Sequence, residues 1–520
     1  MTGKNNITTE RVEPDGRKAV LIGLMLTMGL SAMDISIVAT VIPSLVRDLS
    51  GFALFPWIFS AYLLASTVVN PIYGKLADMY GRKPLLLVGV SIFLLGSVLC
   101  GFAWNMIALI VFRGIQGIGA GSIQTLTSTV VGDIYTLEER GKIQGWLSSV
   151  WGISAVIGPA IGGLFVEFIS WRWIFFINLP IGLAALVMIT TRLHENVVHR
   201  KRQIDFLGVF LLIVGAGSLI FALLQGGVSW DWFSAPSLII FAVGIAALLF
   251  FAWHERRTAE PVIPPWVFGR RVLVGANLAS CIAGIVTIGL TTFLPSFAQR
   301  VLGADAITAG LAMATLSIGW PLASSFSARL YLRFSFRNTA LMGIVVCVIA
   351  SVLLALLPEN TSTLAIAGCS FIMGVGLGLV TTSMLVGVQS VIGWNRRGVV
   401  TAANMFMRAL GSTLGAALFG SISNSILAGW LRDAPANLKG QLPANVNDLS
   451  NLSAYSNPAA LNYIRDGLYT STNAVFWGLL VVTLIGLVVL VFTPQKFKEL
   501  SFGEAESGNV RNEAAVKSAG

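Results

Sequence analysis

About fourteen apolar runs, each near the length that crosses a bilayer, divide this chain of 520 residues. A mean hydropathy of +0.80 and a charged fraction of only 11% exclude a soluble globular domain. The sequence therefore predicts an all-α polytopic membrane protein. The runs lie near residues 18–42, 55–76, 84–103, 106–131, 143–166, 173–191, 205–226, 234–253, 272–299, 306–331, 338–357, 362–391, 398–428 and 473–493.

The distribution of basic residues predicts the orientation of these helices. The net charge of +10 would also fit a nucleic-acid-binding protein, but Lys and Arg are concentrated in alternate loops. Cytoplasmic loops of membrane proteins carry this excess. We therefore expect both termini in the cytoplasm, an even number of helices, a location in the plasma or inner membrane, and no nucleic-acid partner.

The runs group as six helices, two additional helices and six more. A basic loop ends the first group, and a segment rich in proline and charge follows the two additional helices, as expected of a linker. The basic turn 329–338 occupies the same place in the second group as the turn 74–84 in the first, which indicates two repeated halves. The predicted segments are a cytoplasmic tail (1–17), a first half (18–191), inserted helices (205–253), a linker (254–271), a second half (272–493) with an outer loop (429–470), and a cytoplasmic tail (494–520).

The polar residues give no sign of catalysis. Cys100, Cys281, Cys347 and Cys369 lie in apolar runs without metal-ligand spacing. Neither a nucleotide-binding loop nor a catalytic triad occurs in the sequence. We therefore expect no enzyme activity, no cofactor and no metal, and ATP-driven pumping has no support.

Asp34 is the only carboxylate that any reasonable topology leaves inside the membrane. An ionised side chain at this depth costs several kcal/mol or more, so it is rarely kept without a function. A single acid among many membrane helices indicates first a proton or cation site.

The turn from Gly74 to Pro84 carries the most specific motif. Its sequence, Gly-Lys-Leu-Ala-Asp-Met-Tyr-Gly-Arg-Lys-Pro, resembles the loop signature of the major facilitator superfamily. Gly74 allows two helices to approach closely, and Asp78 can accept hydrogen bonds from a neighbouring helix N-terminus or from Arg82. The resemblance implies a charged cytoplasmic latch that opens as the two halves rock; the alternative is a basic loop that only sets topology. The latch residues would be Gly74, Asp78, Gly81, Arg82 and Lys83.

A second motif in the fourth run places a base near Asp34. Arg113-Gly-Ile-Gln116-Gly-Ile-Gly-Ala-Gly resembles the arginine motif of the same superfamily. Arg113 and Asp34 each lie about eight residues, or roughly 12 Å, from the predicted outer ends of their runs. We expect Arg113 to hold Asp34 ionised in one state and to leave it in another, with Gln116 as a nearby polar contact. A fixed structural ion pair is the alternative.

The fifth run carries small residues in a regular register. Gly145, Ser154, Gly158, Pro159, Gly162 and Gly163 are similar to the antiporter motif of drug exporters. Small residues allow one helix to press against another, and a proline bends the axis. With the first-run segment Met33–Val38 and the loop residues Glu138–Gly141, this motif resembles the fourteen-helix drug:proton antiporter branch, of the EmrB/QacA type.

The resemblance implies a proton-coupled multidrug efflux transporter of two six-helix halves, with Asp34 and Arg113 coupling protons and Gln116, Asn404 and Arg408 lining the substrate cavity. Because the acids other than Asp34 fall in loops, in tails or at helix ends, we expect neutral or monocationic lipophilic substrates. We also expect a monomer in the lipid bilayer. Arg408 has two open roles, as a structural anchor or a substrate contact. The alternatives are an exporter of a metabolite, lipid or amphipathic anion, and a membrane protein without transport.

Overall fold

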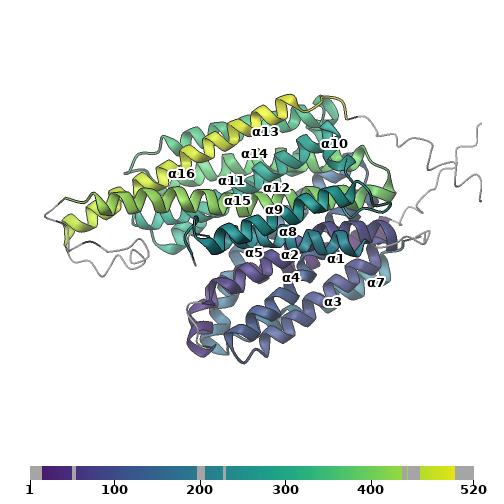
Figure 1. Ribbon diagram of the computed structural model, residues 1–520, viewed down its shortest axis with the longest axis horizontal. Coiled ribbons are helices and arrows are strands. Elements are labelled where there is room, and N and C mark those ends of the chain that lie inside the picture. Colours follow the sequence, from purple (N-terminus) through teal and green to yellow (C-terminus); the bar gives the residue numbers. More distant parts are fainter. Residues whose placement is uncertain are drawn as a thin grey trace, which may run out of the picture.

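A computed structural model describes residues 14–49, 54–195, 205–226, 230–435, 438, 442 and 457–497. Most of the two predicted tails, and parts of the basic loop before residue 205 and of the outer loop 429–470, lie outside these ranges; residues 14–17 of the first predicted tail belong to the first helix. Long helices make up most of the described chain (Figure 1). They are α1 (Pro14–Leu49), α2 (Pro56–Tyr80), α3 (Arg82–Gly101), α4 (Met106–Ile134), α5 (Leu137–Phe168), α6 (Trp173–Phe176), α7 (Asn178–Arg192), α8 (Phe206–Gln225), α9 (Ala235–Glu255), α10 (Trp266–Gly269), α11 (Arg271–Arg300), α12 (Ala306–Phe334), α13 (Phe336–Ala355), α14 (Thr363–Ser390), α15 (Arg397–Arg432) and α16 (Pro458–Phe492).

The described residues contain 13 helical segments that are long and apolar enough to cross a membrane. Helix α2, with 25 residues, completes the predicted fourteen. Helix α1 continues past Pro43 to Leu49, and α15 and α16 extend into the predicted outer loop 429–470. Residues 458–470 of this predicted outer loop are thus the first part of α16.

Local sequence signals determine where these helices begin and end. The side chain of Asn105 accepts a hydrogen bond from the backbone N–H of Ala108 and caps α4. Thr136 and Glu139 form a capping box at the start of α5. The Thr308 hydroxyl holds the pKa of Asp305, the cap of α12, below its ordinary range.

The two halves turn in the same way at equivalent places. Gly81 separates α2 from α3 with φ 98°, and Ser335 separates α12 from α13 with φ 90°. A serine in this left-handed region is strained, but its side chain accepts a hydrogen bond from the N–H of Asn338. The second copy of the turn thus reproduces the backbone of the first without its glycine, as expected for repeated halves.

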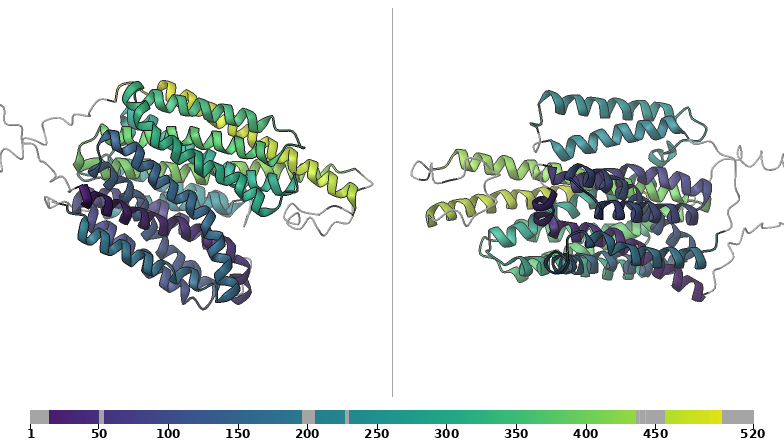
Figure 2. Two further views of the ribbon diagram at one scale, coloured as in Figure 1. Left: turned by 180° about the vertical axis from the view of Figure 1, so that it is seen from behind. Right: turned by 90° about the horizontal axis from the view of Figure 1, so that it is seen from below.

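Each half has its own core. In the first half (α1–α7), α4 packs between α2 and α3, and α5 packs on α1. In the second half (α11–α16), α14 packs against α12 and α13, and α15 against α11. Figure 2 shows the inserted helices α8 and α9 side by side along one flank of the bundle. There, α8 contacts both α2 and α15, so it covers one of the places where the halves meet.

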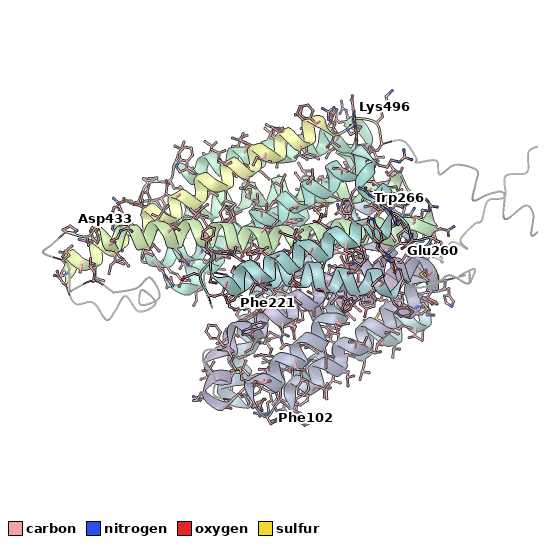
Figure 3. All side chains as sticks on the ribbon, in the orientation of Figure 1. Phe102, Phe221, Glu260, Trp266, Asp433 and Lys496 are labelled. Atoms are coloured by element: carbon pink, nitrogen blue, oxygen red, sulfur yellow. The ribbon has the colours of Figure 1, made fainter. Side chains whose placement is uncertain are left out.

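The end of the bundle at which α1 begins and α16 ends is named the terminal end; Lys496 marks it in Figure 3, and Asp433 marks the opposite end. The two halves lie closest at the terminal end and diverge toward the opposite end (Figure 1). They meet mainly through two helix pairs, α2 with α15 and α5 with α12, with smaller contacts of α4 with α15 and of α5 with α14. The seam between the halves is therefore closed at the terminal end.

Candidate functional site

Asp34 lies within a compact polar cluster in the middle of the first half. Its carboxylate forms a close ion pair with Nη1 of Arg113 and accepts a hydrogen bond from Nε2 of Gln116 at 2.8 Å. Nδ2 of Asn178 approaches the same carboxylate at 3.4 Å. Asp34 is 2% exposed and Arg113 is completely buried. The three residues predicted from the sequence thus occupy one site, closed to water in this conformation.

Arg113 is held from several sides. It donates to Oε1 of Gln116 at 2.7 Å and to the carbonyl of Ile58 at 3.3 Å. Its guanidinium carbon lies 4.3 Å from the centroid of the Tyr62 ring, within cation–π range. Among the described residues, its Nη2 has no hydrogen-bond partner. Arg113 therefore has a spare donor beside Asp34.

The glycines of the α4 motif explain why Arg113 and Gln116 reach Asp34. A Cβ added to Gly117 would lie 2.5 Å from the carbonyl of Tyr62 in α2, and one added to Gly119 would lie 2.4 Å from the backbone of Phe93 in α3. Such contacts are far shorter than real Cβ contacts, so only glycine lets α4 lie this close to both neighbours. The motif thereby places its polar residues in the centre of the half.

Sequence reasoning missed two members of the cluster. Tyr62 donates or accepts a hydrogen bond with Ser31 at 3.0 Å while its ring lies against Arg113. Asn178, at the start of α7, also donates to Oγ of Ser97 at 2.9 Å. Asn178 is a lone amide at the start of an apolar run, and this was the only signal available in the sequence.

The predicted latch residues lie at the terminal end, where they join the halves. The carboxylate of Asp78 accepts hydrogen bonds from the backbone N–H groups of Gly398 and Val399, each at 2.9 Å. These groups begin α15, where the helix dipole also favours a negative charge. Asp78 additionally pairs with Arg82 at 2.9 Å. Both contacts considered for Asp78 from the sequence are present together.

Arg82 connects this latch to Asp133 and Trp394. Its Nε pairs with Asp133 at 2.9 Å, and its guanidinium lies over the ring of Trp394 at 3.8 Å. Asp133 also pairs with Arg397 of the second half at 2.5 Å. Lys83 instead lies aside, donating to the carbonyl of Thr190. Asp133 is thus shared by one arginine from each half.

Gly74 and Gly81 have separate roles in the latch. A Cβ on Gly74 would lie 2.3 Å from the Cβ of Ala402 and 2.7 Å from the carbonyl of Gly398, so α2 and α15 touch at this residue. Gly81 provides the left-handed turn between α2 and α3. The first glycine therefore permits contact between the halves, and the second permits a turn within one half.

The small residues of α5 face two different partners. A Cβ on Gly145 would lie 2.0 Å from Oγ of Ser325 in α12, whereas Gly158 and Gly162 press against Ser36 and Thr40 of α1. Ser154 is buried. Pro159 and Gly163 are exposed, and a Cβ on Gly163 would meet nothing within 4 Å. Helix α5 is thus in tight contact with the other half near the terminal end and with its own half farther out.

The predicted cavity residues of the second half have unlike surroundings. Asn404 is buried, accepts from Oγ of Ser280 at 2.9 Å and donates to the carbonyl of Ala276 at 3.2 Å. Arg408, one turn farther along α15, is partly buried, with its guanidinium carbon 4.9 Å from the ring centroid of Trp320. Asn404 therefore joins α15 to α11, while Arg408 reaches toward α12.

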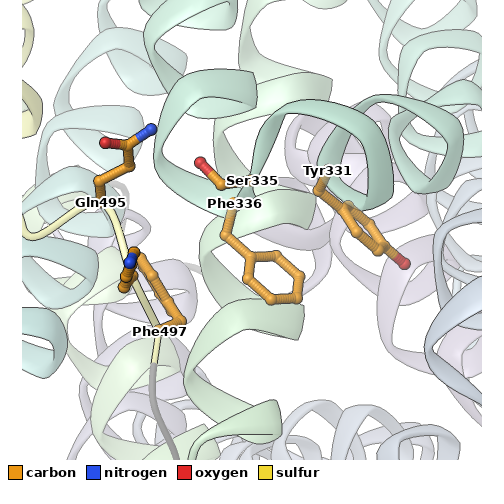
Figure 4. A pocket seen from close by; sticks show the side chains of 6 residues that line it. Tyr331, Ser335, Phe336, Gln495 and Phe497 are labelled. Atoms are coloured by element: carbon orange, nitrogen blue, oxygen red, sulfur yellow. The ribbon is translucent and has the colours of Figure 1, made fainter.

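A separate pocket of about 380 Å³ opens at the terminal end, away from Asp34 (Figure 4). Tyr331, Ser335, Phe336 and Phe497 belong to its lining. The rings of Tyr331 and Phe336 stack at 4.8 Å, and the Tyr331 hydroxyl donates to the carbonyl of Leu137 in the other half. This pocket borders the closed contact between the halves and lacks a buried acid.

Comparison with known proteins gives a consistent family. Residues 24–205 and 195–416 match the model of the Major Facilitator Superfamily. The chain is 34% identical to Multidrug resistance protein 3 of Bacillus subtilis (strain 168) over 91% of this chain and 94% of that protein. It is 33% identical to Multidrug transporter protein MdtP of the same organism, over 96% of each chain.

Solved structures share the fold at low sequence identity. The human organic anion transporter MFSD10 matches with a TM-score of 0.61 and 14% identity, over 92% of this chain and all of that one. A bacterial homologue of the iron transporter ferroportin, crystallised in an outward-facing state, matches with a TM-score of 0.60 and 12% identity, over 92% of this chain and 98% of that one. These two likenesses concern the arrangement of the helices.

Proposed function

The chain belongs to the Major Facilitator Superfamily, and we propose that it is a proton-coupled multidrug efflux transporter that exchanges lipophilic compounds for protons. The family and the relatives named as multidrug proteins support export of small molecules. Transporters of this family are not enzymes, and the chain is a multi-pass membrane protein. The proposal extends this to coupling by protons and to a defined orientation.

The buried pair of Asp34 and Arg113 is the observation that carries the proposal. A carboxylate within a membrane can exchange a proton only if its environment alternates between states that favour and disfavour its charge. Here Arg113 and Gln116 both donate to it, so a negative charge on Asp34 has two partners in this conformation. When the halves rock and these donors withdraw, Asp34 takes up a proton, and restoring the contacts releases it.

The closed terminal end defines one state of this cycle. Rocking to the other state must break the hydrogen bonds that Asp78 accepts from Gly398 and Val399, and the ion pair of Asp133 with Arg397. The excess of Lys and Arg in the loops of this end supports a cytoplasmic location for it, in the plasma or inner membrane. The conformation described is then closed to the cytoplasm. We further propose that the protein works as a monomer.

Efflux from proteoliposomes with an imposed pH gradient tests the coupling. Asp34→Asn should abolish proton-driven export of a lipophilic dye, because an amide cannot alternate between charge states, and Asp34→Glu should retain part of it. Asp433→Asn, which changes an exposed acid at the opposite end, is the matched control and should export normally. Export by Asp34→Asn at the wild-type rate would refute proton coupling through this residue.

A further inference from the structure

Arg408 differs in its partners from four other buried or half-buried arginines of the described chain. Arg82, Arg113 and Arg397 each pair with a carboxylate, and Arg140 donates to the carbonyls of Tyr135 and Gly132. Within the described ranges, the guanidinium of Arg408 has neither an ion pair nor a hydrogen bond to protein. It lies instead over the ring of Trp320. A cation at membrane depth without a counter-ion costs free energy, so an unpaired arginine here indicates a site for an anionic partner.

The position of Arg408 places this cation on the seam. Helix α15 meets the first half through α2, and α12 meets it through α5. A side chain that extends from α15 to Trp320 of α12 therefore spans the two helices of the second half that meet the first half. The α15 contacts of Asp78 and Gly74 involve residues 398–402, so Arg408 lies beyond this closure, toward the end where the halves diverge.

A second unpaired donor lies near this face. Asn277 in α11 is 1% exposed, and its Oδ1 accepts from Nδ2 of Asn404, one helical turn before Arg408. Its own Nδ2 has no partner among the described residues. A buried amide N–H without an acceptor costs about 1–3 kcal/mol, and a ligand oxygen would remove that cost. The hydrogen-bond donors of Arg408 and Asn277 thus border the same region, and neither is paired with a carboxylate.

The balance of charges inside the membrane also favours binding of an anionic ligand. Asp34 is neutralised by Arg113, which leaves Arg408 as the uncompensated charge among the described residues of the membrane interior. A guanidinium fork binds carboxylates with two parallel hydrogen bonds, and the guanidinium of Arg408 lies within cation–π distance of the Trp320 ring. This balance of charges favours an anionic ligand at Arg408 and is compatible with neutral substrates.

We propose that Arg408, oriented by Trp320, is the anion-binding subsite of the transporter and that its ligands are amphipathic acids, compounds with a carboxylate on a lipophilic body. This inference rests on the proposed efflux function for its place in the cycle, because the same seam carries the exported compound. The acid group binds Arg408 and the apolar body lies along the seam. Asp34 remains available for the proton. The proton and the acid group of the ligand therefore bind in different halves.

Equilibrium binding of a matched pair of probes tests the subsite. Dansyl-undecanoic acid and its methyl ester differ only in the charge that Arg408 would recognise. The wild-type protein in nanodiscs should bind the acid about 10- to 100-fold more tightly than the ester, the range for a charge-assisted hydrogen bond. Arg408→Gln should remove this difference without changing the Kd of the ester, and Arg408→Lys should restore part of it. Arg432→Gln, an exposed arginine at the end of the same helix, is the control.

The possible results separate the subsite from the efflux function. Equal binding of acid and ester by the wild type, or an equal loss of both in a folded Arg408→Gln, would refute the subsite. If a proton gradient still drives export of the ester in that case, the efflux function is supported although the subsite is refuted. If the acid binds through Arg408 but Asp34→Asn exports the ester normally, proton coupling fails and the subsite stands.

Discussion

Gly74→Ala should shift the transporter away from the conformation that is closed at the terminal end. The new Cβ would lie 2.3 Å from the Cβ of Ala402, whereas ordinary contacts begin at 3.4 Å. Helices α2 and α15 must therefore separate by about 1 Å, at a site where both are buried. Overpacking of this kind costs about 1–3 kcal/mol, which lowers the ratio of closed to open molecules about 5- to 150-fold.

Pulsed electron paramagnetic resonance can measure this shift. Spin labels at Tyr80 and Phe334, which are exposed at the terminal end of α2 and α12, report the separation of the halves. The distance distribution should move to longer values in Gly74→Ala. Removing the opposing methyl group in the double variant Gly74→Ala/Ala402→Gly should reverse part of the change. Gly163→Ala is the control, because its Cβ would meet nothing within 4 Å. If Gly74→Ala and Gly163→Ala give the same distribution as the wild type, the contact does not govern closure.

Two further predictions concern the Asp34 cluster and the orientation of the chain. Asn178→Leu should reduce both thermal stability and proton-driven efflux, because it leaves Ser97 and Asp34 buried with one donor fewer, at a cost of about 1–3 kcal/mol. Unchanged melting and transport would show that the amide is not needed. A cysteine at Phe102 should react with an impermeant thiol reagent in intact cells, whereas one at Lys496 should react only after permeabilisation. The opposite pattern would reverse the topology.

Much of the fold followed from sequence because hydrophobic length and loop charge are local properties. The fourteen helices and the two-half arrangement needed no information on tertiary packing. The positions of the helix ends, in contrast, depend on tertiary packing. Helix α1 passes through Pro43 because proline is tolerated where neighbouring helices surround it, and α16 begins at Pro458 although the sequence there is polar.

The candidate site was predictable where a residue type is rare at its depth. Asp34 and Arg113 stood out as charges in apolar runs, and their contact is present in the structure. Tyr62 and Asn178 did not stand out, because an aromatic or an amide in a membrane helix has many ordinary roles. The double role of Asp133, shared by Arg82 and Arg397, depends on how the halves meet, and no local pattern encodes it.

The placement of α8 gives the protein two unlike sides toward the lipid. Because α8 contacts both α2 and α15, and packs Leu211, Leu212 and Ala216 into their shared apolar cluster, protein covers that flank of the seam. The contact of α5 with α12 has no such cover from the inserted helices in the described chain. On one side of the molecule, α8 thus separates the seam from the lipid, and on the other side the α5–α12 junction is left uncovered by the inserted helices. A compound dissolved in the bilayer can therefore approach the seam laterally from one side only.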